Sequence, residues 1–196
     1  MSRQKILIFL GSTRVGRMGE RVAKFVQATV EENGMEPILF DPCELPFEVL
    51  RQPLHFMPNP EDAPAWLKEA DEKIKSADGF IIVSAEYNCG IPPALTNMMN
   101  HFSPASYRHR PCGIVTYSMG IYGGVRAGAF IRPFASELGI VTIPSYVGIP
   151  TVGEHFDADG TSKTERIANN VNKLVNEVGW YAKALGTYKT ANPPPS

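Results

Sequence analysis

Short runs of apolar residues alternate along the chain with segments in which apolar residues recur every three or four positions. A continuous apolar run is typical of a strand buried on both faces, and the longer spacing is typical of an amphipathic helix. The pattern predicts strands at residues 6–10, 38–40, 79–83, 113–117 and 140–147. Helices are predicted after each strand, around residues 22–30, 66–74, 95–102, 127–138 and 167–185. The sequence of residues 162–165, Ser-Lys-Thr-Glu, has the pattern of a capping box that begins the last helix.

Strict alternation of strands and helices predicts a parallel sheet with helices on both faces. Proline cannot donate to an internal ladder, and Pro37 and Pro144 fall in the second and fifth strands. These strands should therefore be the edges, which favours a flavodoxin-like α/β three-layer sandwich with a five-stranded parallel sheet of order 2-1-3-4-5. The Rossmann order would need a sixth strand, which the pattern does not supply. We also expect Pro133 to kink the fourth helix.

Length and composition narrow the class of protein. The 196 residues suit one domain, which we place at residues 1–190, followed by a disordered tail at residues 191–196. A formal net charge of −1 excludes the basic footprint of a nucleic-acid-binding protein and disfavours an electron shuttle that docks by charge. The three cysteines fit neither a zinc site nor a disulfide framework. No segment resembles a signal peptide or a membrane span, so we predict a cytoplasmic protein.

In such a sheet, ligands bind beyond the carboxyl ends of the strands where the strand order reverses, which here lies between the first and third strands. The loop after the first strand, residues 11–19, reads GSTRVGRMG. It lacks the lysine and hydroxyl of a P-loop, because Arg17 and Met18 stand in their places. A helix N-terminus, the hydroxyl of Ser12 or Thr13 and an arginine suit a terminal phosphate bound without a metal. The alternative is a plain turn with solvated side chains.

Two further loops are expected at the same end of the predicted sheet, where the strand order reverses. Residues 84–92 follow the third strand, and there Asn88 and Gly90 tolerate positive φ, so the backbone could turn its polar groups toward a flat heteroaromatic ring. Tyr87 could cover or wall that ring. Residues 118–124 contain three glycines, which indicates close approach of the backbone to a ligand. For residues 84–92 the alternative is an ordinary strand-to-helix connection. For residues 118–124 the alternative is a flexible loop that meets no ligand.

These loops resemble those of the NAD(P)H-dependent FMN reductases, a flavodoxin-like family that includes quinone, azo and chromate reductases. The family pattern, roughly P-E-Y-N-x-x-x-P-x-x-L-K-N followed by S-x-G-x-x-G-G-x-R-A, is similar to residues 85–97 and 118–127, after GSTR at residues 11–14. The chain departs from it with Ala85 in place of proline and Thr96 in place of lysine, and it has Cys89 at a variable position.

The resemblance implies the cofactor and its binding residues. FMN would be bound and NAD(P)H would be the co-substrate. The phosphate would be held by Ser12, Arg14 and the backbone of residues 15–19, which includes Arg17, Met18 and Gly19. The isoalloxazine would be lined, chiefly by backbone groups, by Glu86, Tyr87, Asn88 and Cys89, with Ser118 and Gly120 at its other edge.

The resemblance also implies an oxidoreductase that passes hydride from NAD(P)H to FMN and then two electrons to small acceptors: quinones, free flavin, azo compounds or metal oxyanions. No side chain need act as acid, nucleophile or metal ligand, because the cofactor carries the chemistry. A flavodoxin-type FMN electron carrier and a non-catalytic FMN-binding protein are the alternatives.

A homodimer is expected, with a tetramer as the alternative. The third and fourth predicted helices carry more apolar residues than the core of one chain should absorb, among them Met99 and Phe130. Two-fold packing of this helix pair would bury them. The family resemblance implies the same arrangement, with the flavin near the interface.

Overall fold

The central element is a five-stranded parallel sheet of order β2-β1-β3-β4-β5. We describe residues 3–194 of a computed structural model. The strands are β1 (Lys5–Leu10), β2 (Glu36–Phe40), β3 (Gly79–Ala85), β4 (Pro111–Tyr117) and β5 (Val141–Ile149). The predicted order is therefore confirmed, and Pro37 and Pro144 both lie in edge strands.

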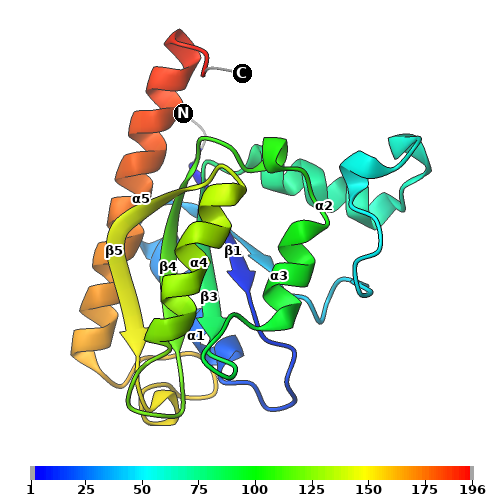
Figure 1. Ribbon diagram of the computed structural model, residues 1–196. Coiled ribbons are helices and arrows are strands. Elements are labelled where there is room, and N and C mark those ends of the chain that lie inside the picture. Colours follow the sequence, from blue (N-terminus) through cyan, green and yellow to red (C-terminus); the bar gives the residue numbers. More distant parts are fainter. Residues whose placement is uncertain (1–2, 195–196) are drawn as a thin grey trace.

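Helices cover both faces of the sheet and make three layers (Figure 1). One face packs against α1 (Gly19–Glu32) and α5 (Glu165–Ala191), and the other against α2 (Ala65–Ser76), α3 (Pro93–Asn100) and α4 (Val125–Glu137). Because side chains of a strand alternate in direction, β1 supplies both cores: Ile6 and Ile8 face α1 and α5, while Leu7 and Phe9 face the other layer. No helix of the described residues is long and apolar enough to cross a membrane.

Several sequence expectations need correction. Ser162 does not close a capping box, because its hydroxyl accepts from the N–H of Thr164, and α5 begins at Glu165 with no side-chain cap on its first turn. Pro133 lies inside α4 as expected, and the kink expected there stays a prediction. Ala191 is still helical, so the predicted disordered tail does not begin there; residues 195–196 of that prediction lie outside the described residues.

The segment between β2 and α2 covers α3, which the sequence pattern did not anticipate. It contains two short 3₁₀ turns, η1 (Leu54–Phe56) and η2 (Pro60–Asp62). Asn97 of α3 holds this segment, since its side chain accepts from the N–H of Leu50 at 2.8 Å and donates to the carbonyl of Glu48 at 2.9 Å. Met99, also in α3, is fully buried in the core of its own chain. The expectation that Met99 lies at a dimer interface is therefore wrong.

The loops after β1, β3 and β4 meet at one end of the sheet, the lower end in Figure 1. β1 and β3 are adjacent, paired from Ile6 with Gly79 to Leu10 with Val83, so the two loops that follow them leave the sheet side by side. This is the point at which the strand order reverses, and it is where the predicted ligand site should lie.

Candidate functional site

A cavity of about 380 Å³ opens at this end of the sheet. Most of the predicted binding residues line it: Ser12, Arg14, Arg17, Met18, Glu86, Tyr87, Ser118 and Gly120. Gly19, Asn88 and Cys89 do not line it directly. Val15 and Gly16, whose backbone was predicted at the phosphate, line it as well, and the sequence analysis missed four further lining residues: Ala85, Tyr117, Met119 and Val152.

The first and second loops are joined across the cavity by Ser12 and Tyr87. The two hydroxyl oxygens lie 2.5 Å apart, and Ser12 is buried. The guanidinium of Arg14 lies over the Tyr87 ring at 3.6 Å from its centroid, a cation–π contact. Among the described residues Arg14 forms no ion pair, so its positive charge stays available at the cavity wall.

The side chain of Arg17, of which only the backbone was predicted to meet the phosphate, has partners within the protein. Its guanidinium forms a bidentate ion pair with Asp41, which directly follows β2, and the Nη1–Oδ1 distance is 2.7 Å. The same Nη1 donates to the carbonyl of Ser12 at 2.6 Å. The guanidinium of Arg17 thus bonds to Asp41 and Ser12 within the protein, while its backbone keeps the predicted place beside the ligand.

Tyr117 brings an unsatisfied hydroxyl to the start of α1. The residue is 4% exposed, and its Oη has no hydrogen-bond partner in the described part of the chain. Burial raises the pKa of this phenol, and the nearby Ser12 hydroxyl and Gly19 N–H offset only part of the shift, so the phenol stays protonated and able to donate. Leaving a buried donor unpaired costs about 1–3 kcal/mol, so a ligand oxygen there would be favourable. Sequence reasoning could have found Tyr117, because it ends β4 immediately before the third loop.

Gly19 makes room for that hydroxyl. A Cβ at this position would lie 2.1 Å from Tyr117 Oη, far inside contact distance. Gly19 is the first residue of α1, and no side chain caps the first turn of this helix. The N–H groups of an uncapped helix N-terminus attract anions. The start of α1 and the Tyr117 hydroxyl therefore form one polar end of the cavity.

The Glu86 side chain caps the N-terminus of α4. Its Oε2 accepts from the backbone N–H groups of Arg126 at 3.0 Å and Ala127 at 3.3 Å, and its Oε1 accepts from Arg126 Nε at 2.7 Å. Burial alone would raise the pKa of Glu86, but the hydrogen bonds from Arg126 and Ala127 offset this and lower the pKa. Glu86 and Arg126 therefore orient the second and third loops, and only the Glu86 backbone can face a ligand.

The second loop turns sharply at Asn88 and Cys89, which have φ values of 48° and 65°. Tyr87 and Gly90 close this turn with two backbone hydrogen bonds of 3.1 and 2.9 Å. Positive φ was expected at Asn88 and Gly90; it occurs at Asn88 and Cys89 instead. Both residues lie beyond the cavity lining, and Cys89 is exposed.

The third loop is held by the segment that follows β5. The N–H of Thr151 donates to the carbonyl of Gly120, and the N–H of Val152 donates to the carbonyl of Ser118, each at 3.1 Å. Ser118 Oγ also donates to the carbonyl of Gly120 at 2.9 Å. Because these carbonyls are satisfied internally, the loop keeps its shape beside the cavity.

Comparison with known proteins agrees with this geometry. Residues 4–154 match the family of NADPH-dependent FMN reductases. The quinone reductase of Escherichia coli K12 is 29% identical over 153 residues, which cover 74% of this chain and 77% of that protein. The NAD(P)H-dependent FMN reductase of Schizosaccharomyces pombe is 29% identical over 155 residues, covering 72% and 70%. The solved structure of FerB, an NAD(P)H:(acceptor) oxidoreductase from Paracoccus denitrificans, has a similar fold, with a TM-score of 0.75 and 20% identity over 92% of this chain and 98% of FerB.

Proposed function

The chain belongs to the family of NADPH-dependent FMN reductases, and from this premise we propose where it holds its cofactor, which acceptors it reduces and how it assembles. Its activity is that of an FMN-dependent NAD(P)H oxidoreductase. When bound, FMN receives two electrons from NAD(P)H and delivers them to an acceptor. The residues of the chain have to bind and orient the reactants and exclude water.

The FMN phosphate binds at the N-terminus of α1. The observation that carries this proposal is the buried, unpartnered hydroxyl of Tyr117 against Gly19 at the uncapped end of the helix. Tyr117 would donate to a phosphate oxygen, the N–H groups of residues 15–19 would supply further donors, and Arg14 would supply the positive charge. Ser12 would contribute its hydroxyl, which is in contact with the Tyr87 hydroxyl.

The isoalloxazine lies against the backbone of residues 85–87 and 118–120. Both segments line the cavity, and the hydrogen bonds of Glu86 and Val152 fix their shape without using cavity-facing side chains. Backbone donors and acceptors in fixed positions can bind the polar edge of a flat ring. Asn88 and Cys89 support the turn and do not contact the ring directly.

The acceptors are small planar molecules such as quinones. Two observations favour this class: the exposed apolar side chains of Val15 and Met119 at the cavity wall, and the names of the relatives, which include quinone reductases and FMN-dependent NADPH-azoreductases. An apolar wall beside an open ring face suits flat aromatic acceptors. A cytoplasmic location stays a prediction.

Anaerobic addition of NADPH to the FMN-loaded protein tests the activity. We expect the flavin absorbance to bleach within the mixing time of a manual assay and to return when a quinone is added, because electrons enter from NADPH and leave to the quinone. A flavodoxin-type carrier would bind FMN and keep its oxidised spectrum after NADPH is added. Failure to bleach would therefore contradict the reductase activity and favour the carrier.

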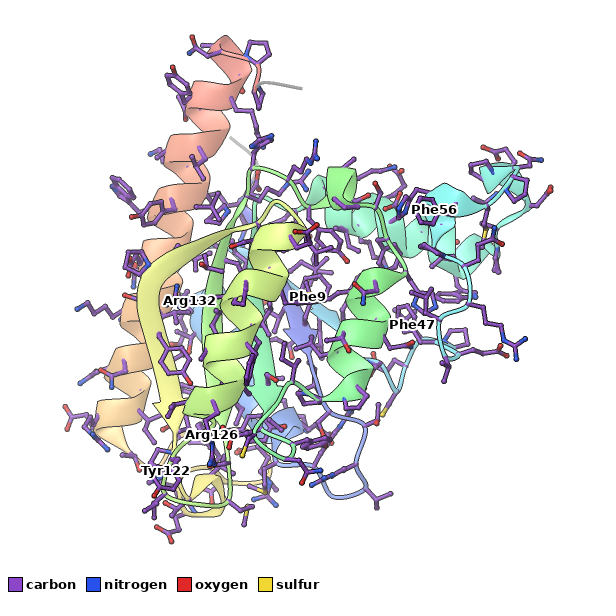
Figure 2. All side chains as sticks on the ribbon, viewed as in Figure 1. Phe9, Phe47, Phe56, Tyr122, Arg126 and Arg132 are labelled. Carbon is purple, nitrogen blue, oxygen red and sulfur yellow. The ribbon has the colours of Figure 1, made fainter. Side chains whose placement is uncertain are left out.

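The outer face of α4 and the third loop is the surface that we propose for a homodimer. Phe130 is 57% exposed there, and Ile121, Tyr122 and Val125 are exposed as well. Figure 2 shows Tyr122 and Arg126 at the end of the molecule where the loops meet. A dimer packed on this face would bury the exposed apolar side chains and place the partner chain beside the FMN site.

A charge at Phe130 should split this dimer. For Phe130→Glu we expect sedimentation as a 21.5 kDa monomer at concentrations where the wild type is a dimer, because burying an unpaired carboxylate at the two-fold contact is costly. The FMN affinity of this variant should fall as well, because the partner chain would no longer lie beside the FMN site. Trp180→Glu is the matched control, because Trp180 is a large side chain 66% exposed on α5, on the opposite face of the sheet. A monomeric wild type at micromolar concentration would reject the dimer.

A further inference from the structure

The buried pair of Arg17 and Asp41 lies beneath the loop that is proposed to hold the FMN phosphate. The side chains are 10% and 6% exposed, respectively. Asp41 Oδ1 accepts from Arg17 Nη1 at 2.7 Å and from the N–H of Cys43 at 2.9 Å, while Oδ2 accepts from Arg17 Nη2. Both carboxylate oxygens are thus engaged, and the geometry of the carboxylate is fixed before any ligand binds.

Two adjacent strands bring the pair together. β1 and β2 are paired up to Phe9 and Phe40, so the chain continues from neighbouring positions into the phosphate loop on one side and into Asp41 on the other. Arg17 comes from the end of the same loop and reaches back to Asp41. The ion pair therefore connects the loop of residues 11–19 to the end of β2, the adjacent edge strand.

Ser12 is held from two directions by this arrangement. Its carbonyl accepts from Arg17 Nη1 at 2.6 Å, and its hydroxyl lies 2.5 Å from the Tyr87 hydroxyl. Arg17 thus positions the backbone of Ser12, and Asp41 positions Arg17. Both guanidinium nitrogens that contact Asp41 are therefore oriented by groups of the protein before any ligand binds.

We propose that Asp41 is a positioning residue for the cofactor: it holds Arg17 under the phosphate loop so that the loop is preformed, and Arg17 is not itself a phosphate ligand. This inference rests on the proposed FMN site at the start of α1. A preformed loop binds more tightly than one that must be ordered on binding. In metal sites, groups that orient the ligating residues change affinity by about 10–100-fold when they are removed, and we expect an effect of the same size here.

The sign of the effect of Asp41→Asn separates this role from direct binding by Arg17. If Arg17 bound the phosphate, Asp41 would compete for the guanidinium, and removing its charge would leave FMN binding unchanged or make it tighter. If Asp41 positions the loop, the same substitution breaks a buried pair and leaves a buried charge unpaired, so FMN binding weakens. Weaker FMN binding therefore indicates the positioning role, and unchanged or tighter binding indicates direct binding by Arg17.

The experiment is a fluorescence titration of the apo-protein with FMN and, in parallel, with riboflavin, which lacks the phosphate. For Asp41→Asn we expect an FMN Kd raised by about 10–100-fold and a riboflavin Kd changed by less than about threefold, since only the phosphate loop is disturbed. A merely structural defect would weaken both ligands alike. Asp71→Asn is the matched control, because Asp71 is also a buried, hydrogen-bonded carboxylate but lies on α2, outside the cavity lining.

A second variant keeps the test decisive if Asp41→Asn folds poorly. Arg17→Met combined with Asp41→Leu replaces the ion pair by apolar side chains, which proteins often tolerate at a buried pair. We expect this double variant to bind FMN more tightly than Arg17→Met alone, because no unpaired carboxylate remains. Equal FMN affinity of wild type and Asp41→Asn, or a double variant as weak as Arg17→Met, would overturn the inference. A wild type that binds no FMN would instead refute the proposed function.

Discussion

Replacing Gly19 by alanine is expected to weaken FMN binding by about 5–150-fold, the effect of the 1–3 kcal/mol that an overpacked contact costs. The added Cβ would lie 2.1 Å from Tyr117 Oη and 2.9 Å from Leu10 Cδ1. Leu10 is fully buried in β1, so the relief must come from Tyr117 or from the start of α1. Either movement displaces donors that are proposed to meet the phosphate. Titration of the apo-protein with FMN measures the effect.

Gly186→Ala is the matched control for this substitution. Gly186 lies in α5 outside the cavity lining, an added Cβ would meet no atom within 4 Å, and its φ is not positive. We expect its FMN affinity to stay within about twofold of the wild type, because a surface substitution without a clash changes little. The clash in Gly19→Ala should also lower the melting temperature. Adding Tyr117→Phe removes the closest contact and should restore the melting temperature in part. An unchanged FMN affinity in Gly19→Ala would show that the phosphate does not lie at the start of α1.

Removing the Arg14 guanidinium is expected to raise the Kd for FMN by about 10–150-fold, because a hydrogen bond to a charged group contributes about 1.5–3 kcal/mol. Arg14 lies in a loop, so the free energy of unfolding should change little. The effect should shrink at high salt, since the contact is electrostatic.

Arg51→Ala provides the comparison for Arg14→Ala, because Arg51 is an exposed arginine outside the cavity lining. Its FMN affinity should equal that of the wild type at every salt concentration. If Arg14→Ala behaves in the same way as Arg51→Ala, the positive charge of the site comes from elsewhere, and the assignment of Arg14 fails.

The fold was predictable because its signals are local. Apolar runs mark the strands, and the proline positions in β2 and β5 identify the edges, so the sheet order and the position of the cavity follow from the sequence alone. Tyr117 could also have been predicted as a site residue, because the last residue of a central strand lies at the same edge of the sheet as the loops. The general position of the site therefore needed no structure.

Side-chain partners distant in sequence were not predictable. An arginine in a glycine-containing loop looks the same whether it meets a phosphate or a carboxylate, and the carboxylate of Asp41 is 24 residues away from Arg17. The apolar face of α3 presented the same difficulty. Its residues suggested a subunit interface, whereas the segment held by Asn97 covers that helix within one chain. Such a pattern reports that a face is buried but does not identify what buries it.

Glu86 illustrates a further limit of motif reading. The second and third loop motifs each match the family pattern, but only the structure shows that Glu86 of one bonds to Arg126 and the α4 backbone of the other. A motif residue can therefore orient two loops, and its side chain need not contact the ligand.

The central claim is that the start of α1 and Tyr117 bind a phosphate, and comparing the affinities of the wild-type apo-protein for FMN and riboflavin tests it most directly. The two ligands share the same ring and differ by the phosphate group. With several donors and the charge of Arg14 on that group, we expect FMN to bind at least about 100-fold more tightly than riboflavin, equivalent to roughly 2.8 kcal/mol. Equal affinities for the two ligands would contradict the claim.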